Sequence, residues 1–466
     1  MLCLKRNIAG KTAKESNKEK ERQLPISKSG PITPIKQSES TTAVSSNNGA
    51  QSAPTTPVIP MQEEISHTEM NQINDVTDKL EKVVQITPDR IGQAIDSLMT
   101  PALVLDIDRI KANAQAMLKR AEEYGVQLRP HMKAHKTLEG ANIMTGGTKR
   151  CISVSTLAEA KFYADAGYDD ILFAGYLDKD KVEICAEIAE EIKSFHVLLD
   201  SYYVIELLRD RPLKDDKVWS VYIGVECRYN GTGVDPLDYS GVGLAVSLTS
   251  EPNIFFNGLY VNCENAYSCT DAEAVLGVGQ DTANTVINFA KKLRYYYAYR
   301  KMKKHKVEFP HVNFGSTPVC SLPFEVMKNV TEWNAGSYIF YDMRNKTLGA
   351  CNTDDIAIEV LAKVIAHYPN RNQLLIDCGW TALNYQGSQH GHGVFKGHPH
   401  LKITSMFQEE SKVEDVRGNL DLGRYPIGTI LRILPYNACA TAALHGSFYI
   451  HSKGVVVEEW RPVKGW

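Results

Sequence analysis

Short apolar runs alternate with stretches of helical period through the middle of the chain. Apolar positions recur at helical spacing in Ile107–Tyr124, Thr156–Ala166, Tyr202–Arg209 and Asp271–Lys304. The apolar runs read as strands, namely Val126–Met132, Arg150–Val154, Asp170–Ala174, Phe195–Asp200, Trp219–Val225, Ile254–Val261, His311–Phe314 and Trp333–Phe340. Eight strands with helices between them predict an α/β fold, a (β/α)8 TIM-type barrel over residues 107–344. An open doubly wound sheet is the alternative, because the apolar pattern does not fix the number of strands.

The period changes from 3.6 to 2 after about Arg344. Apolar and polar residues alternate in Asp355–Val360, and again near Leu374, Ile403, Ile430, Phe448 and Val455, with glycine and proline turns between these runs. The pattern predicts a C-terminal antiparallel β domain over residues 345–466. A further apolar run lies early in the chain, within residues 100–106, and also reads as a strand.

The first 65 residues have no helical or strand period. They are rich in Ser, Thr, Asn, Gln, Lys and Pro, which predicts a disordered N-terminal tail. Residues 66–99 read as a helical lead-in. Asn71–Gln85 has helical spacing, and Thr87-Pro88 has the form of an N-cap followed by proline at the first position of a short helix to Leu98.

Composition and charge exclude several classes of function. A chain of 466 residues is long enough for two cores, and a net charge of −3 gives no case for a nucleic-acid partner. No apolar run approaches the roughly 18 residues that a membrane span needs. The ten cysteines are scattered and include no C-x-x-C pair, which favours reduced thiols and a cytoplasmic location.

The strongest candidate for chemistry is the basic segment Leu128–Lys136, with sequence LRPHMKAHK. It holds two lysines, two histidines and an arginine at the end of a predicted strand, where α/β folds place their active sites. A lysine held there can lose solvation and form a Schiff base. The alternative for such a segment is a basic loop on a solvated surface.

This segment resembles the lysine motif of the D-serine dehydratase and D-threonine aldolase family, R-P-H-x-K-T/A-H-K, and every position matches. The resemblance extends from about Thr100 to the end of the chain. It implies an alanine-racemase-like barrel that binds pyridoxal phosphate (PLP) through Lys133, with Lys136 as a neighbouring cation. Arg129 and His131 would lie at the cofactor. The family's β domain takes strands from both ends of the chain, so residues 100–106 would join it.

A second motif, Gly315-Ser316-Thr317-Pro318, follows the seventh predicted strand. Glycine lets backbone N–H groups approach a phosphate, and the two hydroxyls add donors. The family uses this motif for the PLP phosphate, and the glycine and tyrosine of Gly336-Ser337-Tyr338 resemble further phosphate contacts. The resemblance therefore implies that Gly315, Ser316, Thr317, Gly336 and Tyr338 bind the cofactor. Thr156 reads as a helix cap.

Other family motifs are altered. The sixth strand of the family runs G-L-Y-x-H-x-G-H-x-Y, and here Asn262 and Asn265 replace both histidines and Glu264 replaces the glycine. The two tyrosines remain, and Tyr267 becomes a catalytic candidate beside Lys133. The family's zinc motif P-N-H-x-C is also changed, because Asn437 stands for the histidine while Cys439 is kept. Asparagine is a poor zinc ligand beside a thiolate, so zinc binding is in question, with His445 as a conceivable substitute.

The resemblance implies a PLP-dependent lyase that converts D-serine or a related D-β-hydroxy amino acid to a keto acid and ammonia, working as a homodimer. The altered motifs keep two alternatives open. One is a catalytically inactive relative that binds PLP and has a binding or regulatory role, and the other is a PLP-free barrel. A histidine-rich segment carries His390, His392, His398 and His400, which could form a metal site or a polar surface loop.

Overall fold

The computed structural model describes residues 90–227, 232–299 and 311–466, all of which belong to one compact unit, Leu80–Trp466. The predicted disordered tail, the predicted helix Asn71–Gln85 and most of the helical lead-in lie outside the described residues. Among the described helices none is long and apolar enough to cross a membrane.

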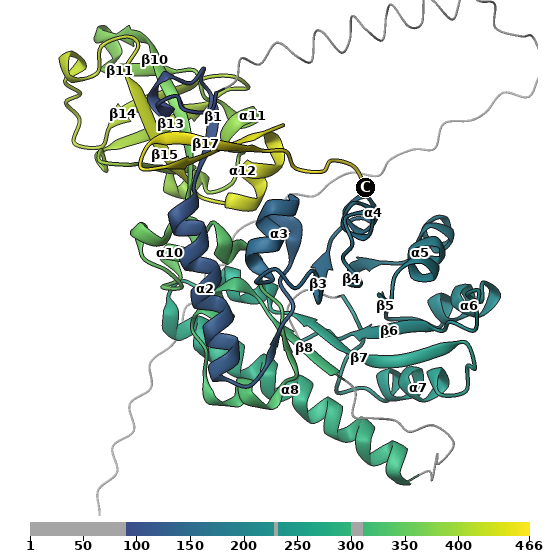
Figure 1. Cartoon of the computed structure of the whole chain (residues 1–466). Helices are drawn as coiled ribbons and strands as arrows, with labels where there is room; N and C mark the ends of the chain where they lie inside the picture. The colour runs from purple at the N-terminus through teal and green to yellow at the C-terminus, as the bar shows by residue number, and fades with distance from the viewer. Residues whose placement is uncertain (1–89, 228–231, 300–310) are drawn as a thin grey trace, which may run out of the picture. The chain divides into compact units, whose positions relative to one another are not determined.

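Eight parallel strands form the barrel. They are β2 (Gln127–Leu128), β3 (Ile152–Val154), β4 (Asp170–Tyr176), β5 (Ser194–Leu199), β6 (Trp219–Gly224), β7 (Ile254–Asn262), β8 (His311–Gly315) and β9 (Glu332–Trp333). Their order is β2-β9-β8-β7-β6-β5-β4-β3. Figure 1 labels β3 to β8. The ring closes just beyond β2, where His131 bridges to Ser153 and the Ser153 N–H donates to the carbonyl of Pro130 at 2.9 Å. The predicted barrel is therefore confirmed, and the open sheet is excluded.

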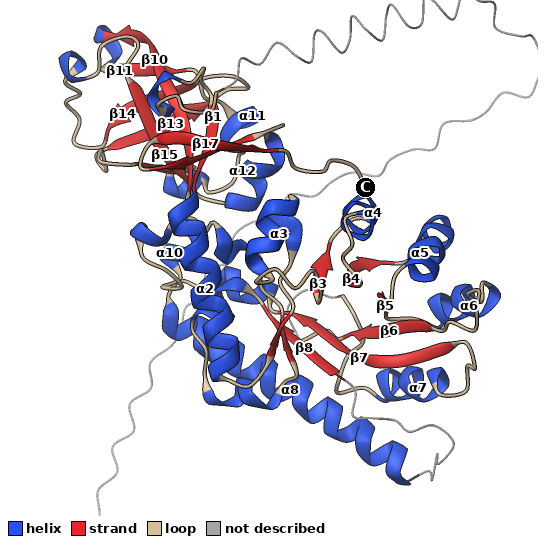
Figure 2. Ribbon diagram, in the orientation of Figure 1, coloured by secondary structure: helices blue, strands red, loops and turns tan. Residues whose placement is uncertain are grey.

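Helices follow most of the barrel strands, as Figure 2 shows in blue around the red sheet. Helix α2 (Ile107–Glu123) precedes the first barrel strand. The others are α3 (Leu138–Met144), α4 (Leu157–Asp165), α5 (Lys179–Glu191), α6 (Tyr202–Asp210), α7 (Tyr239–Leu248), α8 (Ala272–Tyr299), α9 (Thr317–Ser321) and α10 (Met343–Thr347). Local sequence fixes several helix starts. The Asp106 carboxylate accepts the N–H groups of Asp108 and Arg109 at the start of α2. The Thr156 hydroxyl accepts from Glu159 N–H at 3.2 Å, which confirms the predicted cap.

A second sheet holds the remaining strands. They are β1 (Ala102–Asp106), β10 (Ile358–Tyr368), β11 (Gln373–Ile376), β12 (Gly393–Phe395), β13 (Leu401–Met406), β14 (Ser411–Asp415), β15 (Ile430–Pro435), β16 (Phe448–Ser452) and β17 (Val455–Trp460). The pairings are antiparallel except for β1 with β16, which is parallel. Strand β1, from the start of the described chain, therefore lies between β10 and β16. Two short helices, α11 (Trp380–Leu383) and α12 (Ala438–Leu444), complete this part.

The predictions fail at two places where tertiary contacts override local pattern. The predicted helix from Pro88 to Leu98 is wrong in its described part. There Ala94 bridges to Val455 and the N–H of Ile95 donates to Gly454, so this backbone pairs with the β16–β17 hairpin, and only one 3-10 turn, Ile95–Ser97, forms. The predicted strand Trp333–Phe340 is wrong beyond Trp333, because the chain turns at Gly336 into the 3-10 helix η5 (Ser337–Ile339).

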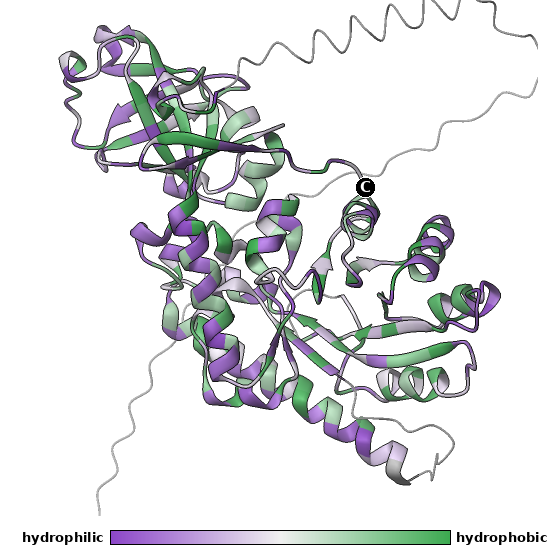
Figure 3. Ribbon diagram, in the orientation of Figure 1, coloured by the Kyte–Doolittle hydropathy of each residue, from purple (hydrophilic) through white to green (hydrophobic). Residues whose placement is uncertain are grey.

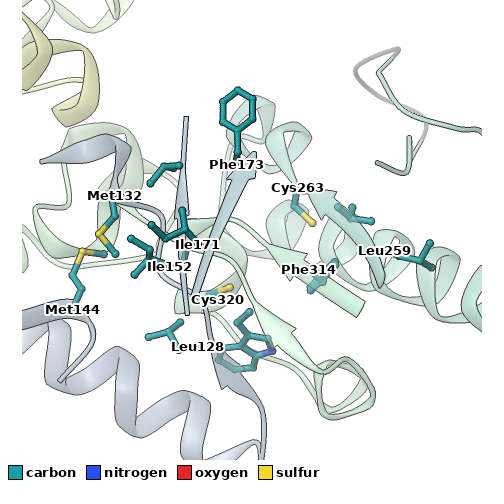
Figure 4. Close-up of a cluster of buried hydrophobic side chains, with 14 of the residues drawn as sticks. Leu128, Met132, Met144, Ile152, Ile171, Phe173, Leu259, Cys263, Phe314 and Cys320 are labelled. Carbon is teal, nitrogen blue, oxygen red and sulfur yellow. The ribbon is translucent and has the colours of Figure 1, made fainter. Parts of the chain in front are cut away.

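One apolar core runs through the barrel and into the second sheet. Figure 4 shows part of it, with Leu128, Ile152, Ile171 and Phe314 buried together. The same cluster includes Ala438 of α12 and Phe448 of β16, so the barrel and the second sheet share a buried interface. Helix α2 carries both hydrophilic and hydrophobic residues along its length, as expected for a helix with one face on this core (Figure 3).

Candidate active site

Lys133 lies just beyond the carboxyl end of the first barrel strand. The chain leaving β2 keeps pairing with the eighth strand, since Arg129 N–H donates to Trp333 O and His131 N–H to Ala335 O, each at 2.9 Å. Pro130 has no N–H, and the chain then turns into the 3-10 helix η2 (Met132–Ala134). Lys133 sits half-buried in this turn, and no described residue makes an ion pair or hydrogen bond with its Nζ.

Gly336 lets the eighth strand approach the lysine turn closely. A Cβ at this position would lie 2.5 Å from the carbonyl oxygen of His131, which is closer than real contacts allow. A glycine is therefore required where these two segments meet.

The two predicted phosphate motifs come together. Gly315 ends β8 with a φ of 146°, and a Cβ there would meet the carbonyl oxygen of Asn334 at 2.8 Å. The Gly336 N–H donates to the Thr317 hydroxyl at 3.3 Å, which joins the two motifs directly. The Ser316 hydroxyl is buried, and no described residue hydrogen-bonds to it. A buried donor without a partner is costly, so this position suits a polar ligand.

Tyr267 lies beside the same turns. The Tyr267 hydroxyl is 3.2 Å from the Ser337 hydroxyl, and the Arg344 guanidinium lies over the Tyr267 ring at 4.6 Å. Burial raises the pKa of Tyr267 far above its ordinary value, which keeps the phenol protonated. Tyr338 is fully buried in the apolar core. Its hydroxyl, like that of Ser316, has no partner among the described residues, so its contact with a phosphate stays a prediction.

Two titratable side chains, His131 and Lys136, lie in the same segment as Lys133. Burial, followed by the cations Lys133 and Lys136, holds the pKa of His131 well below its usual range, so the imidazole is neutral. Its Nδ1 accepts the Lys133 N–H at 3.3 Å. Lys136 is ion-paired, because its Nζ lies 2.8 Å from the Glu159 carboxylate. Lys136 therefore does not act as an unbalanced cation beside Lys133.

Arg129 belongs to a different place in the barrel. Its guanidinium donates to both oxygens of Glu332 at 2.9 and 3.1 Å, to Asp170 at 2.7 Å and to the carbonyl of Ile152 at 3.3 Å. It lines a cavity of about 410 Å3 formed by the first residues of several strands, among them Asp170, Ser194, His311 and Glu332. That is the amino end of the barrel, opposite the Lys133 turn. The predicted cofactor contact of Arg129 is wrong, because internal partners occupy the guanidinium.

A smaller cavity of about 120 Å3 opens at the carboxyl ends of β4 to β7. Its lining is mostly polar and comprises Ala174, Tyr176, Leu198, Gly224, Val225, Glu226, Cys227, Thr232, Tyr260, Asn262 and Asn265. Asn334 of the eighth strand donates to the Tyr260 hydroxyl at 2.8 Å, which ties this cavity to the Gly315–Gly336 turns. Asn262 and Asn265, the two replaced histidines, thus line the open mouth of the barrel.

The altered metal motif does not fit zinc. Cys439 lies in the first turn of α12, and Asn437 caps that helix through its side-chain oxygen. His445 ends the helix with its Nε2 2.8 Å from the carbonyl of Ala382, so it does not replace the missing histidine. The described chain contains no group of three or more His, Cys, Asp or Glu side chains able to hold a metal.

The four other histidines serve local structure. His398 and His400 both contact the Tyr425 hydroxyl, at 3.2 and 2.9 Å, and His390 stacks on Tyr436. The Nδ1 of His392 lies 3.1 Å from the carbonyl of Gln386. Each of the four imidazoles thus has a hydrogen-bond or stacking partner in the protein, and His392 is buried rather than on the surface.

Comparisons with known proteins find similar sequences over most of this chain. The family described as "Putative serine dehydratase domain" matches residues 357–451. D-serine dehydratase of Dictyostelium discoideum is 31% identical over 80% of this chain and 98% of its own length.

Solved structures show the same fold. D-threo-3-hydroxyaspartate dehydratase from Delftia sp. HT23 is 27% identical and superposes with a TM-score of 0.73 over 80% of this chain and all of its own. A metal-free form of its cysteine-to-alanine variant gives a TM-score of 0.74. An alanine-racemase-like protein from Idiomarina loihiensis, 28% identical, gives 0.72 over 80% of this chain and 99% of its own.

Proposed function

This chain belongs to the D-serine dehydratase family, and on that premise we propose that it is a PLP-dependent lyase converting D-serine, or a related D-β-hydroxy amino acid, to a keto acid and ammonia. The observation that carries the proposal is the position of Lys133. It lies beyond the carboxyl end of the first barrel strand, in a turn that touches Gly336, and Gly336 in turn bonds to Thr317. Barrel enzymes place their chemistry at this end of the strands.

The residues around Lys133 fit a phosphorylated cofactor. The buried hydroxyl of Ser316 lacks a partner among the described residues, and a phosphate oxygen would satisfy it. Gly315, Thr317 and Gly336 would hold the phosphate with Ser316, and Lys133 would hold the cofactor covalently. Pyridoxal phosphate, when bound, supplies an electron sink for the carbanion at Cα.

Side chains of this protein would supply the proton transfer and the hydrogen bonding. The Nζ of Lys133 would accept the proton from Cα. Neutral His131 would add no charge beside it. Tyr267 is proposed as the second catalytic residue, and because burial raises its pKa it would donate a hydrogen bond rather than act as a base.

A homodimer in the cytoplasm is part of the same proposal. The dimer rests on the family resemblance, in which one chain completes the site of the other. The location is supported by the cysteines, since all nine in the described part of the chain are free thiols.

Borohydride trapping tests the cofactor assignment. Purified full-length protein incubated with PLP should turn yellow, and reduction with borohydride should leave a pyridoxyl group on Lys133, located by peptide mass spectrometry. Lys136, three residues away and paired with Glu159, is the internal control and should stay unmodified. A protein that stays colourless in excess PLP would overturn the proposal. Stoichiometric trapping without turnover of any D-amino acid would instead favour a non-catalytic PLP-binding relative.

A further inference from the structure

A network of neutral amides replaces the histidine of the zinc motif. The Asn437 Oδ1 accepts the N–H of Ala440 at 3.0 Å, which caps α12, and its Nδ2 donates to the Gln386 side chain at 2.7 Å. Both ends of the Asn437 amide are therefore occupied. The oxygen that a metal could recruit is therefore a neutral amide carbonyl that already serves as a helix cap.

The network continues into α11. Gln386 N–H donates to the Asn384 side chain at 2.7 Å, the Asn384 Nδ2 donates to the Thr441 hydroxyl at 2.7 Å, and that hydroxyl donates to the carbonyl of Leu383 at 2.9 Å. Every hydrogen bond in this network joins two uncharged groups. The segment carrying Cys439 is thus fixed by hydrogen bonds that need no metal. A neighbouring carboxylate, Asp342, is engaged by the N–H of Ala438 at 2.9 Å, and the His445 imidazole is engaged by the carbonyl of Ala382 at 2.8 Å.

We propose that this enzyme, if it is the lyase proposed above, works without a divalent metal and prefers D-amino acids whose β-substituent leaves as a stable anion, such as a halide or a carboxylate. Hydroxide is a strongly basic leaving group, and a Lewis-acidic metal is one way to make its departure easy. Chloride needs neither a proton nor a metal to depart.

The reaction balances without a metal. The Cα–H and Cβ–Cl bonds of 3-chloro-D-alanine break, and the C–H electron pair forms the Cα=Cβ bond. The proton passes to the Lys133 Nζ and then to solvent, while chloride leaves with the C–Cl pair. Addition of one water then gives pyruvate and ammonium, so no oxidant or reductant is required.

Paired kinetics on the full chain loaded with PLP test this preference. We expect kcat/KM for 3-chloro-D-alanine to exceed that for D-serine on the order of 100-fold or more, since metal assistance to a hydroxide is worth several kcal/mol. Neither rate should change with a chelator, and dialysed protein should hold far less than one zinc per chain by elemental analysis. One tightly held zinc per chain, or D-serine turnover that collapses on chelation, would overturn the proposal.

Substitution at position 437 gives a second readout. Asn437→His pairs an imidazole with Cys439 and should gain zinc in equilibrium dialysis, whereas the matched control Asn437→Ala loses the same cap without adding a ligand. The wild-type measurements decide the proposal even if Asn437→His fails to fold. Equal rates on both substrates with PLP trapped on Lys133 would overturn the preference alone. Absence of trapping would overturn the proposed function as well.

Discussion

Lys133→Ala is expected to lower kcat for 3-chloro-D-alanine and for D-serine by about 1,000-fold or more, because it removes both the cofactor linkage and the proton acceptor at Cα. The cost in stability should be small. No described residue makes a hydrogen bond or ion pair with the Lys133 Nζ, and the side chain is only half-buried, so its loss breaks no such bond. Pyruvate release measured with lactate dehydrogenase, alongside a thermal melt, separates the two effects.

Lys136→Ala is the matched control for this prediction. It removes a lysine from the same loop, but one whose Nζ is bound to the buried carboxylate of Glu159 at 2.8 Å. Its loss leaves that carboxylate unpaired, so it should cost stability more than Lys133→Ala and catalysis less. If Lys133→Ala kept wild-type turnover, or if Lys136→Ala lost activity to the same degree with an unchanged melting temperature, the assignment of the lysine would be wrong.

The barrel could be read from the sequence because each buried parallel strand is a short apolar run between amphipathic helices. Local pattern failed where a distant segment decided the conformation. Residues 91–97 read as a helix, but their backbone pairs with the β16–β17 hairpin more than 350 positions later. The run from Trp333 to Phe340 is apolar enough for a long strand. Only the contact of Gly336 with His131 reveals that the chain must turn there.

In the candidate site, too, local motifs could be predicted and contacts with distant residues could not. The motifs around Lys133, Gly315 and Gly336 could be predicted, and the bond from Gly336 to Thr317 brings two of them together. Arg129 was misplaced because a charged residue at a strand end can face either end of the barrel. What decides its direction is Glu332, 203 residues away, and no pattern near Arg129 signals that partner.

The second large effect that we expect is on stability, and it concerns the buried ion network around Arg129. Arg129 is 2% exposed and Glu332 4% exposed, and the two form a bidentate pair that also receives bonds from Asn313 and Tyr222. Removing Glu332 takes the bidentate partner from Arg129, which keeps Asp170 as its remaining carboxylate. It also leaves the buried Asn313 amide and Tyr222 hydroxyl without this acceptor. Glu332→Ala is therefore expected to lower the free energy of unfolding by about 3–5 kcal/mol, measured from urea transitions at pH 7.

A surface pair of the same geometry provides the control. Arg209 donates through two nitrogens to the two oxygens of Glu251, but half of the Arg209 side chain is exposed. Glu251→Ala should shift the urea transition little, since exposed ion pairs gain little over their hydration. Equal shifts for Glu332→Ala and Glu251→Ala would show that burial of the Arg129 pair has no energetic consequence.

The same network predicts how stability depends on pH. Burial alone would raise the pKa of Glu332, but the Arg129 guanidinium and the bonds from Arg129 and Asn313 outweigh it and lower the pKa to about 2, from an ordinary 4.5. A carboxylate with a lowered folded pKa contributes stability above its unfolded pKa, and that contribution disappears as the pH falls through the folded value. The difference in unfolding free energy between wild type and Glu332→Gln should therefore be constant from pH 7 to about 5 and shrink between about pH 4.5 and 2. Urea transitions at pH 7, 5, 4 and 3 measure it, and a difference that stays constant down to pH 3 would mean that Glu332 is not held as a carboxylate by Arg129.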